Sequence, residues 1–200
     1  MTPPRVLLIR HAQSTWNAEG RMQGWADPPL SPAGIEQAEA LGHRLGAEGP
    51  GAVVGVVSSD LARAARTAAI LAEACGCPEP EIDARLRERE IGRLTGLTDE
   101  EARGRYPEEV AAWREQRRPR PPGGESTGSV LGRARAAIDA LMGAAGGREG
   151  GEVVVAVSHG GLISALEREA GAGPGGFSNL TGRWLVPGGP AGWQVGARFG

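Results

Sequence analysis

Residues 6–14 read VLLIRHAQS, and this stretch decides the fold because an unbroken apolar run ends abruptly in an arginine and a histidine. Residues 53–57 and 153–157 form two further short apolar runs that are rich in valine. Such runs, with many β-branched residues, are typical of strands buried on both faces, as in a parallel sheet. We therefore expect three central strands in one sheet.

A helical pattern follows each of these runs, over residues 32–45, 61–74 and 162–170. The alternation of strands and helices predicts an α/β fold, a three-layer α/β/α sandwich with a mostly parallel central sheet. Other segments complete this expectation: helices over about 108–116 and 129–142, terminal strands over 183–186 and 193–195, and Gly/Pro-rich loops at 46–51, 119–124, 143–151 and 171–176.

Length and charge narrow the class of protein. The 200 residues suffice for one compact core, and we expect a single domain over residues 1–200. A net charge of -2 provides no basic field, so we expect no nucleic-acid partner. No apolar run approaches the roughly 20 residues of a membrane span, and the first residues lack a secretory-signal pattern. We therefore expect a cytoplasmic protein with no membrane partner.

The basic residues and the cysteines exclude several kinds of site. All 22 basic residues are arginine, so neither a P-loop lysine nor a Schiff-base lysine is available. Cys75-Gly76-Cys77 is not a C-x-x-C motif, and no second cysteine pair exists to complete a zinc site. We interpret these cysteines as two thiols near a helix end and expect no metal site.

Polar side chains collect where the three predicted strands end. Arg10 and His11 follow the first strand, Arg63 comes shortly after the second, and His159 follows the third. In open parallel sheets ligands bind outside the carboxyl ends of the strands, so we expect these side chains at one edge. The remaining histidine, His43, lies off the apolar stripe of its predicted helix, and we expect it to be exposed.

This cluster suits phosphoryl transfer. Two guanidiniums match phosphate oxygens, a neutral imidazole can attack phosphorus, and helix N-termini near Asp60 and Gly160 add backbone donors. A carboxyl group must also protonate the leaving oxygen. Residues 86–92 read LREREIG and offer Glu88 or Glu90, between which the spacing does not decide. The arginines favour an ionised carboxylate, which is a reason to expect the acid farther from them, towards the leaving group.

Each of these residues alone has a structural interpretation. Arg10 and His11 can end a strand without any chemistry. Arg63 can pair locally with Asp60, if Asp60 is the N-cap of the following helix. The convergence of several such residues on one sheet edge is what favours a functional site.

Several motifs resemble one known family. Residues 10–17, RHAQSTWN, resemble the R-H-G-x-[ST]-x-x-N signature of the histidine phosphatase superfamily, the phosphoglycerate mutase-like proteins. Residues 20–30 resemble its G-R-x-Q-G-x-x-D-x-P-L stretch, and SDLARA, LRE, GGES and SHGG follow in family order at 59–64, 86–88, 123–126 and 158–161. Ala12 departs from the signature, which has Gly there, and its methyl group is tolerated if φ is negative.

The resemblance implies roles by position. His11 is implied as the nucleophile that carries the phosphoryl group, and Glu88 as the general acid and then the base that activates water. Arg10, Arg63 and His159 are implied to grip the phosphate. Further phosphate or substrate contacts are expected of Asn17, Arg21, Gln23, Gly24, Arg89 and Gly160. The resemblance implies no metal and no cofactor, a small phosphate ester as substrate, and a homodimer as in many relatives.

The mutase and phosphatase branches of the family share this site. The compact stretch 89–142 favours a phosphatase, similar to actinobacterial glucosyl-3-phosphoglycerate and broad-specificity phosphatases. Arg89 and Arg117-Arg118 match mutase features, so a phosphoglycerate mutase-type transferase is the alternative. If Arg89 or an arginine from 114–120 faces the pocket, a carboxylate-bearing substrate is expected. A non-catalytic module that binds phosphoesters is a further alternative, although both the nucleophile and the acid are present.

Overall fold

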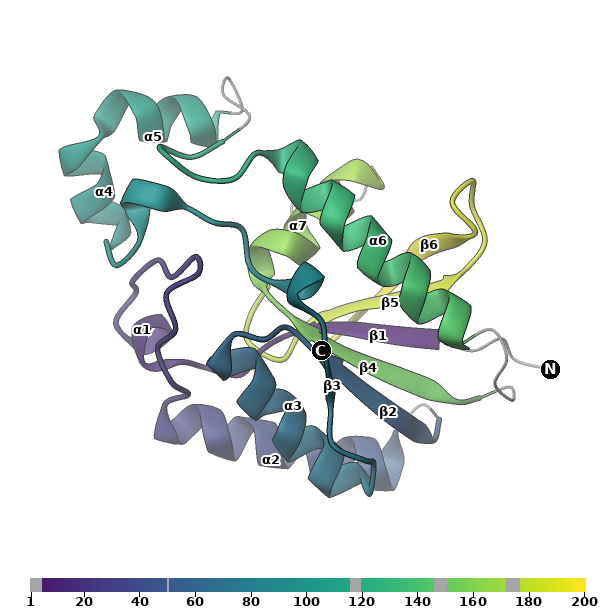
Figure 1. Ribbon diagram of the computed structural model, residues 1–200. Helices are drawn as coiled ribbons and strands as arrows, with labels where there is room; N and C mark the ends of the chain where they lie inside the picture. The colour runs from purple at the N-terminus through teal and green to yellow at the C-terminus, as the bar shows by residue number, and fades with distance from the viewer. Residues whose placement is uncertain (1–4, 50, 116–119, 146–150, 172–176) are drawn as a thin grey trace.

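A single six-stranded sheet organises the molecule (Figure 1). The computed structural model describes residues 5–49, 51–115, 120–145, 151–171 and 177–200. The strands are β1 (Arg5–Arg10), β2 (Val53–Ser58), β3 (Glu81–Ile82), β4 (Val153–Ser158), β5 (Gly182–Pro187) and β6 (Trp193–Phe199). Their spatial order is β3-β2-β4-β1-β5-β6.

The central strands are the three apolar runs of the sequence. β4 lies between β1 and β2 and pairs in parallel with both, with Leu8 opposite Ala156 and Val57 also opposite Ala156. β3 continues the parallel part, whereas β5 is antiparallel to both of its neighbours, β1 and β6. The expectation of a mostly parallel sheet with two terminal strands is therefore confirmed.

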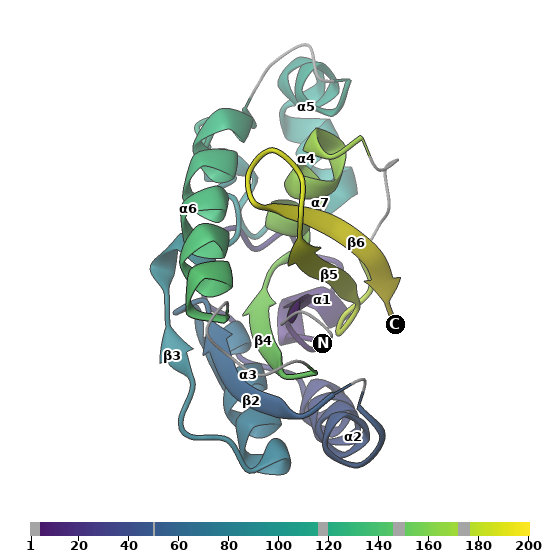
Figure 2. The same ribbon diagram turned by 90° about the vertical axis from the view of Figure 1, so that its right-hand side faces the viewer.

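Helices cover both faces of this sheet. Figure 1 shows α6 and α7 on one side of the sheet and α2 and α3 on the other, and Figure 2 shows the same layers after a quarter turn. The helices are α1 (Thr15–Ala18), α2 (Pro32–Glu48), α3 (Ala62–Cys75), α4 (Asp99–Arg105), α5 (Pro107–Arg114), α6 (Thr127–Ala145) and α7 (Gly160–Glu169). The predicted three-layer sandwich is therefore present.

The alternation of side chains along β1 explains why two hydrophobic cores form. Val6 and Leu8 belong to a core that contains residues of α6 and α7, whereas Leu7 and Ile9 belong to a core that contains residues of α2 and α3. Successive residues of a strand point to opposite faces, so one apolar run supplies both cores. This strand is therefore fixed from both sides, and so is the loop that follows it.

Some short elements and boundaries differ from the expectations. β3 has only two residues, both exposed, so the sequence contains no apolar run that predicts it. Two single-turn 3₁₀ helices, at Ala84–Leu86 and Gly92–Leu94, and the short helices α1 and α4 are also additional. α2 extends to Glu48 and α6 to Ala145, into segments expected to be loops. Parts of the expected loops lie outside the described residues, namely 50, 119, 146–150 and 172–176. The same holds for residue 116 of an expected helix and for Arg117-Arg118.

Other local expectations are confirmed. Cys75 ends α3, and Gly76 closes this helix in the left-handed conformation with φ 67°. Burial raises the pKa of both cysteine thiols, and neither cysteine is in a disulfide. His43 is exposed. Ala12 has a negative φ, as the methyl group at this position requires. In the described part of the chain only one non-glycine residue, Leu180, has a positive φ.

Candidate active site

Two histidines and an arginine meet in the interior at the ends of three strands. His11 follows β1, His159 follows β4, and Arg63 lies in the first turn of α3 after β2. Their exposed fractions are 2%, 0% and 1%, and the two imidazole rings are 5.1 Å apart. The convergence that the sequence predicted is therefore realised.

The hydrogen bonds of His11 fix its tautomer. Its Nδ1 lies 2.7 Å from the backbone carbonyl oxygen of Ala12, which can only accept, so Nδ1 carries the proton. In the neutral ring the lone pair is then on Nε2, to which Nε of Arg63 donates over 3.2 Å. Burial lowers the pKa of His11 well below its ordinary value, and the charges of Arg63 and Arg10 lower it further. The ring is therefore neutral at neutral pH, with Nε2 as the nucleophilic atom.

Arg63 is held by the loop between α1 and α2. Its Nη1 donates to the carbonyl of Ala26 over 2.7 Å and its Nη2 donates to the carbonyl of Gly24 over 2.8 Å. Burial lowers the pKa of Arg63 to about 10, partly opposed by the charges of Glu88 and Asp27, so the guanidinium stays charged at neutral pH. The predicted Gly24 thus contributes its carbonyl oxygen to the position of Arg63.

The structural alternative for Arg63, a local pair with Asp60 as the N-cap of α3, is wrong. Asp60 does not cap α3; instead it accepts two hydrogen bonds from Arg87, at 2.8 and 2.6 Å. Leu61 is at the N-cap position and offers no side-chain acceptor, so Asp27 from the preceding loop accepts from the amide of Ala62 over 2.7 Å. A sequence window around residue 63 could not reveal a cap supplied from 35 residues away.

A cavity of about 740 Å³ opens at this edge of the sheet. Of the residues expected at the site, those that line it are Arg10, His11, Asn17, Arg21, Gln23, Gly24, Arg63, Glu88, Arg89 and Gly160. His159 is not part of the lining and lies buried behind it, with Nε2 2.9 Å from Oγ of Ser59. Its Nδ1 is buried and has no hydrogen-bond partner in the described chain. Burial, followed by the charge of Arg63, lowers the pKa of His159 well below its ordinary value.

Geometry distinguishes between the two candidate acids. Glu88 lines the cavity, and its two carboxylate oxygens accept from the amides of Arg89 over 2.7 Å and Gly161 over 3.0 Å. Glu90 is not among the lining residues, and its carboxylate accepts from the amide of Gly92. The charge of Glu88 raises the pKa of Arg10 and Arg63 against the effect of burial. The expectation that Glu88 lies farther from the arginines, towards the leaving group, stays a prediction.

Two amide side chains on the cavity wall have their oxygens already engaged. The hydroxyl of Ser14 lies 3.1 Å from Oδ1 of Asn17 and 3.0 Å from Oε1 of Gln23. The amide NH₂ groups of Asn17 and Gln23 are therefore the parts that remain to bind a ligand. Arg21 differs, because its guanidinium already pairs with Glu19 and Glu101 at 3.1 and 3.0 Å.

Sequence reasoning missed several residues of the site. Asn179, far along the chain, donates to the backbone carbonyl of His11 over 2.9 Å, and no local pattern announces it. Ser164 and Arg168 line the cavity from α7 together with Gly160. These three positions recur every four residues, which is a helix-face signal that the sequence did carry. Arg114 was not missed, because it belongs to the range 114–120 considered from the sequence; it lines the cavity and pairs with Asp99.

No metal cluster is found in the described part of the chain, where no three His, Cys, Asp or Glu side chains come together as ligands. This finding does not test the expectation of metal-free chemistry, which stays a prediction. Across the same residues, no helix has the length and apolar character that crossing a membrane requires.

Comparisons with known proteins agree with this geometry. A metal-independent phosphoserine phosphatase of Arabidopsis thaliana is 37% identical over 163 residues, 80% of this chain and 66% of that protein, slightly under two thirds of its length. A 2,3-bisphosphoglycerate-dependent phosphoglycerate mutase of Methylobacterium sp. (strain 4-46) is 38% identical over 169 residues, 80% of this chain and 77% of that protein. The structure of a mycobacterial glucosyl-3-phosphoglycerate phosphatase with VO3 aligns with a TM-score of 0.83 and 35% identity, over 96% of this chain and 97% of that one.

The family model of the histidine phosphatase superfamily (branch 1) matches residues 6–180, a stretch that includes every motif quoted from the sequence. The chain belongs to the histidine phosphatase superfamily, branch 1.

Proposed function

We propose that this protein hydrolyses small phosphomonoesters through a phosphohistidine at His11, without a metal ion. The observation that carries the proposal is the buried, neutral ring of His11, whose Nδ1 is bound to a carbonyl and whose Nε2 faces Arg63. This tautomer leaves the lone pair on Nε2, at the wall of a cavity that also contains a carboxyl group.

In the first step Nε2 of His11 attacks phosphorus and the bond from phosphorus to the leaving oxygen breaks. The carboxyl of Glu88 gives that oxygen its proton, so the products are phosphohistidine, the free alcohol and the Glu88 carboxylate. Each carboxyl oxygen of Glu88 accepts one backbone amide and has two acceptor sites, so one site stays open for this proton.

In the second step water attacks the phosphohistidine. The Glu88 carboxylate takes a proton from the water as its oxygen bonds to phosphorus, and the bond from phosphorus to Nε2 breaks. Inorganic phosphate leaves, and the neutral histidine and the protonated acid are restored. The one carboxyl thus serves as acid and then as base.

The remaining polar groups bind the phosphate during both steps. Arg10 and Arg63 neutralise its oxygens, and Gly160 lies at the N-terminus of α7, where backbone amides favour an anion. A phosphate oxygen takes over the Nε–H of Arg63 when the Nε2 lone pair attacks. The unpartnered Nδ1 of His159 supports its role in the grip, because a buried polar atom without a partner is costly.

Arg89 supports a substrate that bears a carboxylate besides its phosphate. Its side chain is 4% exposed and lines the cavity, and its Nη1 donates to the hydroxyl of Thr127 over 3.0 Å. Among the described residues no ion pair involves Arg89, and Glu125 pairs with Arg133 instead. Burial and then the charge of Arg168 lower the pKa of Arg89, partly opposed by the charges of Glu88 and Glu125. Buried cations are usually paired, so an anionic group of the substrate is the fitting partner.

The mutase alternative is kept because relatives of both kinds match this chain at similar identity. A mutase returns the phosphoryl group to the substrate, whereas a phosphatase transfers it to water. Both use the same phosphohistidine, so only the products distinguish them. The cytoplasmic location, the homodimer, the single domain and the absence of a nucleic-acid partner stay predictions.

The test uses protein treated with EDTA and two substrates, p-nitrophenyl phosphate and 3-phosphoglycerate. We expect release of inorganic phosphate from both, abolished by His11→Ala and unchanged by His43→Ala, the matched variant at an exposed position. Formation of 2-phosphoglycerate with little free phosphate would move the protein to the mutases. Activity that survives His11→Ala would overturn the mechanism, and absence of any turnover across a panel of phosphate esters would favour a binding module.

The same panel tests the carboxylate. Glycerol 3-phosphate has the skeleton of 3-phosphoglycerate without its carboxylate, and we expect a lower kcat/KM for it. Arg89→Gln should remove this difference. Equal turnover of both compounds by the unchanged protein would contradict the role of Arg89.

A further inference from the structure

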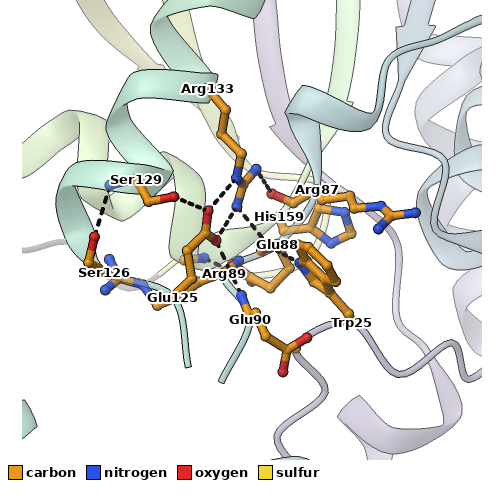
Figure 3. A network of polar contacts seen from close by, with 12 residues as sticks. Trp25, Arg87, Glu88, Arg89, Glu90, Glu125, Ser126, Ser129, Arg133 and His159 are labelled. Carbon is orange, nitrogen blue, oxygen red and sulfur yellow. Dashed lines mark hydrogen bonds and ion pairs between the residues drawn. The ribbon is translucent and has the colours of Figure 1, made fainter. Parts of the chain in front are cut away.

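The backbone carbonyl of Glu88 is held by two side chains from distant parts of the chain. The indole Nε1 of Trp25, from the loop between α1 and α2, donates to it over 2.7 Å. Nη2 of Arg133, from α6, donates to the same oxygen over 2.9 Å. Figure 3 shows both side chains reaching this carbonyl. A surface tryptophan and a helix arginine thus meet at the peptide that follows the proposed acid.

The geometry of a peptide bond links that carbonyl to the carboxyl group. No cis peptide is present in the described chain, so the Glu88–Arg89 peptide is planar and trans, and its C=O and N–H point in opposite directions. Its N–H, at Arg89, donates over 2.7 Å to Oε1 of Glu88 itself. Donors that hold the carbonyl therefore fix the direction of the N–H, and the N–H fixes the carboxyl.

Arg133 is itself held firmly. Its Nε and Nη2 donate to the two carboxylate oxygens of Glu125, both over 2.9 Å, in the forked geometry that makes such pairs strong. The side chains of this pair are only 16% and 12% exposed. Nη1 of Arg133 also donates to the carbonyls of Arg85 and Arg87, and the amide of Glu125 donates to the carbonyl of Glu90 over 2.7 Å. The pair therefore holds the whole segment 85–90.

Trp25 is held from the other side. Its ring lies against the guanidinium of Arg87, 4.7 Å from the ring centre, and Arg87 is anchored by Asp60. The neighbours of Trp25, Gly24 and Ala26, supply the two carbonyls that hold Arg63. One short loop thus touches both the arginine beside the nucleophile and the backbone of the acid.

We propose that Trp25 and Arg133 are positioning residues for the general acid, and that they act by fixing the Glu88–Arg89 peptide. Neither residue donates to the carboxyl directly. The inference rests on the proposed function, because it assigns these side chains to the protonation of the leaving oxygen by Glu88. It predicts a defect that depends on how much a substrate needs that proton.

The experiment compares substrates by leaving group. p-Nitrophenolate departs without much protonation, whereas the alkoxide of 3-phosphoglycerate needs a proton. The quantity measured is kcat/KM, because it reports the steps up to release of the alcohol and is independent of the later hydrolysis of phosphohistidine. Glu88→Gln gives the full size of the leaving-group effect, and His11→Ala gives the background.

For Trp25→Phe we expect kcat/KM for 3-phosphoglycerate to fall about tenfold, and kcat/KM for p-nitrophenyl phosphate to change less than about twofold. The tenfold loss is a part of the roughly 10²–10⁴-fold rate contribution of a general acid. Phenylalanine keeps an aromatic ring that can face Arg87, and Trp25 is 41% exposed, so we expect folding to be preserved. Arg133→Gln should give a larger loss of the same kind. The controls are Trp184→Phe and Arg135→Gln, neither of which lines the cavity. Arg135 lies on α6, as Arg133 does, and both variants should leave kcat/KM for the two substrates unchanged.

The outcomes are distinct. Equal losses on both substrates, or unchanged kinetics in Trp25→Phe, would overturn the inference while the proposed function stands. Arg133→Gln removes the ion-pair partner of Glu125, so this variant can also be destabilised. Its unfolding temperature distinguishes such a folding defect from a loss of positioning. A chain whose hydrolysis does not depend on His11 at all would instead contradict the proposed function.

Discussion

At Gly161, the space for one methyl group decides where the acid's carboxyl can lie. The amide of Gly161 donates to Oε2 of Glu88, and a Cβ built on this residue would lie 2.3 Å from Oε1. The φ of Gly161 is not positive, so the backbone does not require glycine. The close approach of the Glu88 carboxyl is what requires a residue without a Cβ here.

Gly161→Ala should therefore displace the carboxyl of Glu88 with little effect on the fold. The clashing atom is the end of a flexible side chain, so we expect the free energy of unfolding to change by less than about 1 kcal/mol. We expect kcat/KM for 3-phosphoglycerate to fall at least tenfold, since a displacement of about 1 Å can cost far more. Gly132→Ala on α6, where a Cβ meets nothing within 4 Å, is the control. Full activity of Gly161→Ala would show that the carboxyl need not lie where the structure has it.

Much of the site was predictable at this scale because strand ends deliver residues to one edge. Arg10, His11 and Arg63 were found in this way, and the family signature selected Glu88. Trp25 and Arg133 were not predicted, because their role depends on reaching a backbone carbonyl through three-dimensional contacts that no spacing encodes. The same holds for Asn179 at the carbonyl of His11.

At the scale of elements, α3 begins without a cap of its own. Leu61 offers no side-chain acceptor, and the exposed carboxylate of Asp27 accepts from the amide of Ala62. A carboxylate at a helix N-terminus also interacts favourably with the helix dipole. The loop that supplies this cap is the loop whose carbonyls hold Arg63.

Asp27→Ala should cost about 1 kcal/mol in the free energy of unfolding, the usual cost of losing an N-cap acceptor. Asp27→Asn keeps the acceptor oxygen and should lose only a few tenths of that. Urea denaturation of the three proteins measures both values. If Asp27→Ala and Asp27→Asn lower the free energy of unfolding equally, the hydrogen bond from the amide of Ala62 does not stabilise the fold as described.

Element prediction succeeded where periodicity was long and failed where it was short. The central strands and the long helices follow from apolar runs and stripes that tertiary packing reinforces on both faces. β3 has two exposed residues and leaves no pattern. α4 did leave one, because Thr98 and Glu101 form a capping box, but the acidic run behind it was not interpreted as a first helical turn.

At the scale of the whole molecule, two buried neutral histidines make stability depend on pH. Burial is the largest cause that lowers the pKa of both His11 and His159 well below 6.5. In the unfolded chain both take up protons near pH 6.5, whereas in the folded chain they do not. The unfolded state therefore binds more protons below pH 6.5, and stability is lost as the pH falls through this range.

We expect the free energy of unfolding to fall by up to ~1.4 kcal/mol per pH unit for each histidine as the pH drops from 6.5 to about 5. Carboxylates with lowered pKa, such as Asp60 and Asp99, contribute only at lower pH, near their unfolded values. Urea titrations at several pH values give the slope, and His159→Gln should roughly halve it. A stability that is constant between pH 7 and 5 would contradict the neutral, buried state of both rings.

The central claim is that His11 itself carries the phosphoryl group. The most direct measurement is intact-protein mass spectrometry of Glu88→Gln mixed with p-nitrophenyl phosphate and quenched in alkali. This variant still accepts a phosphoryl group from a good leaving group but lacks the base that activates water. We predict that one phosphoryl group accumulates, maps to His11, is lost in mild acid and is absent when His11→Ala is added. An acid-stable adduct, or an adduct on another residue, would contradict the account.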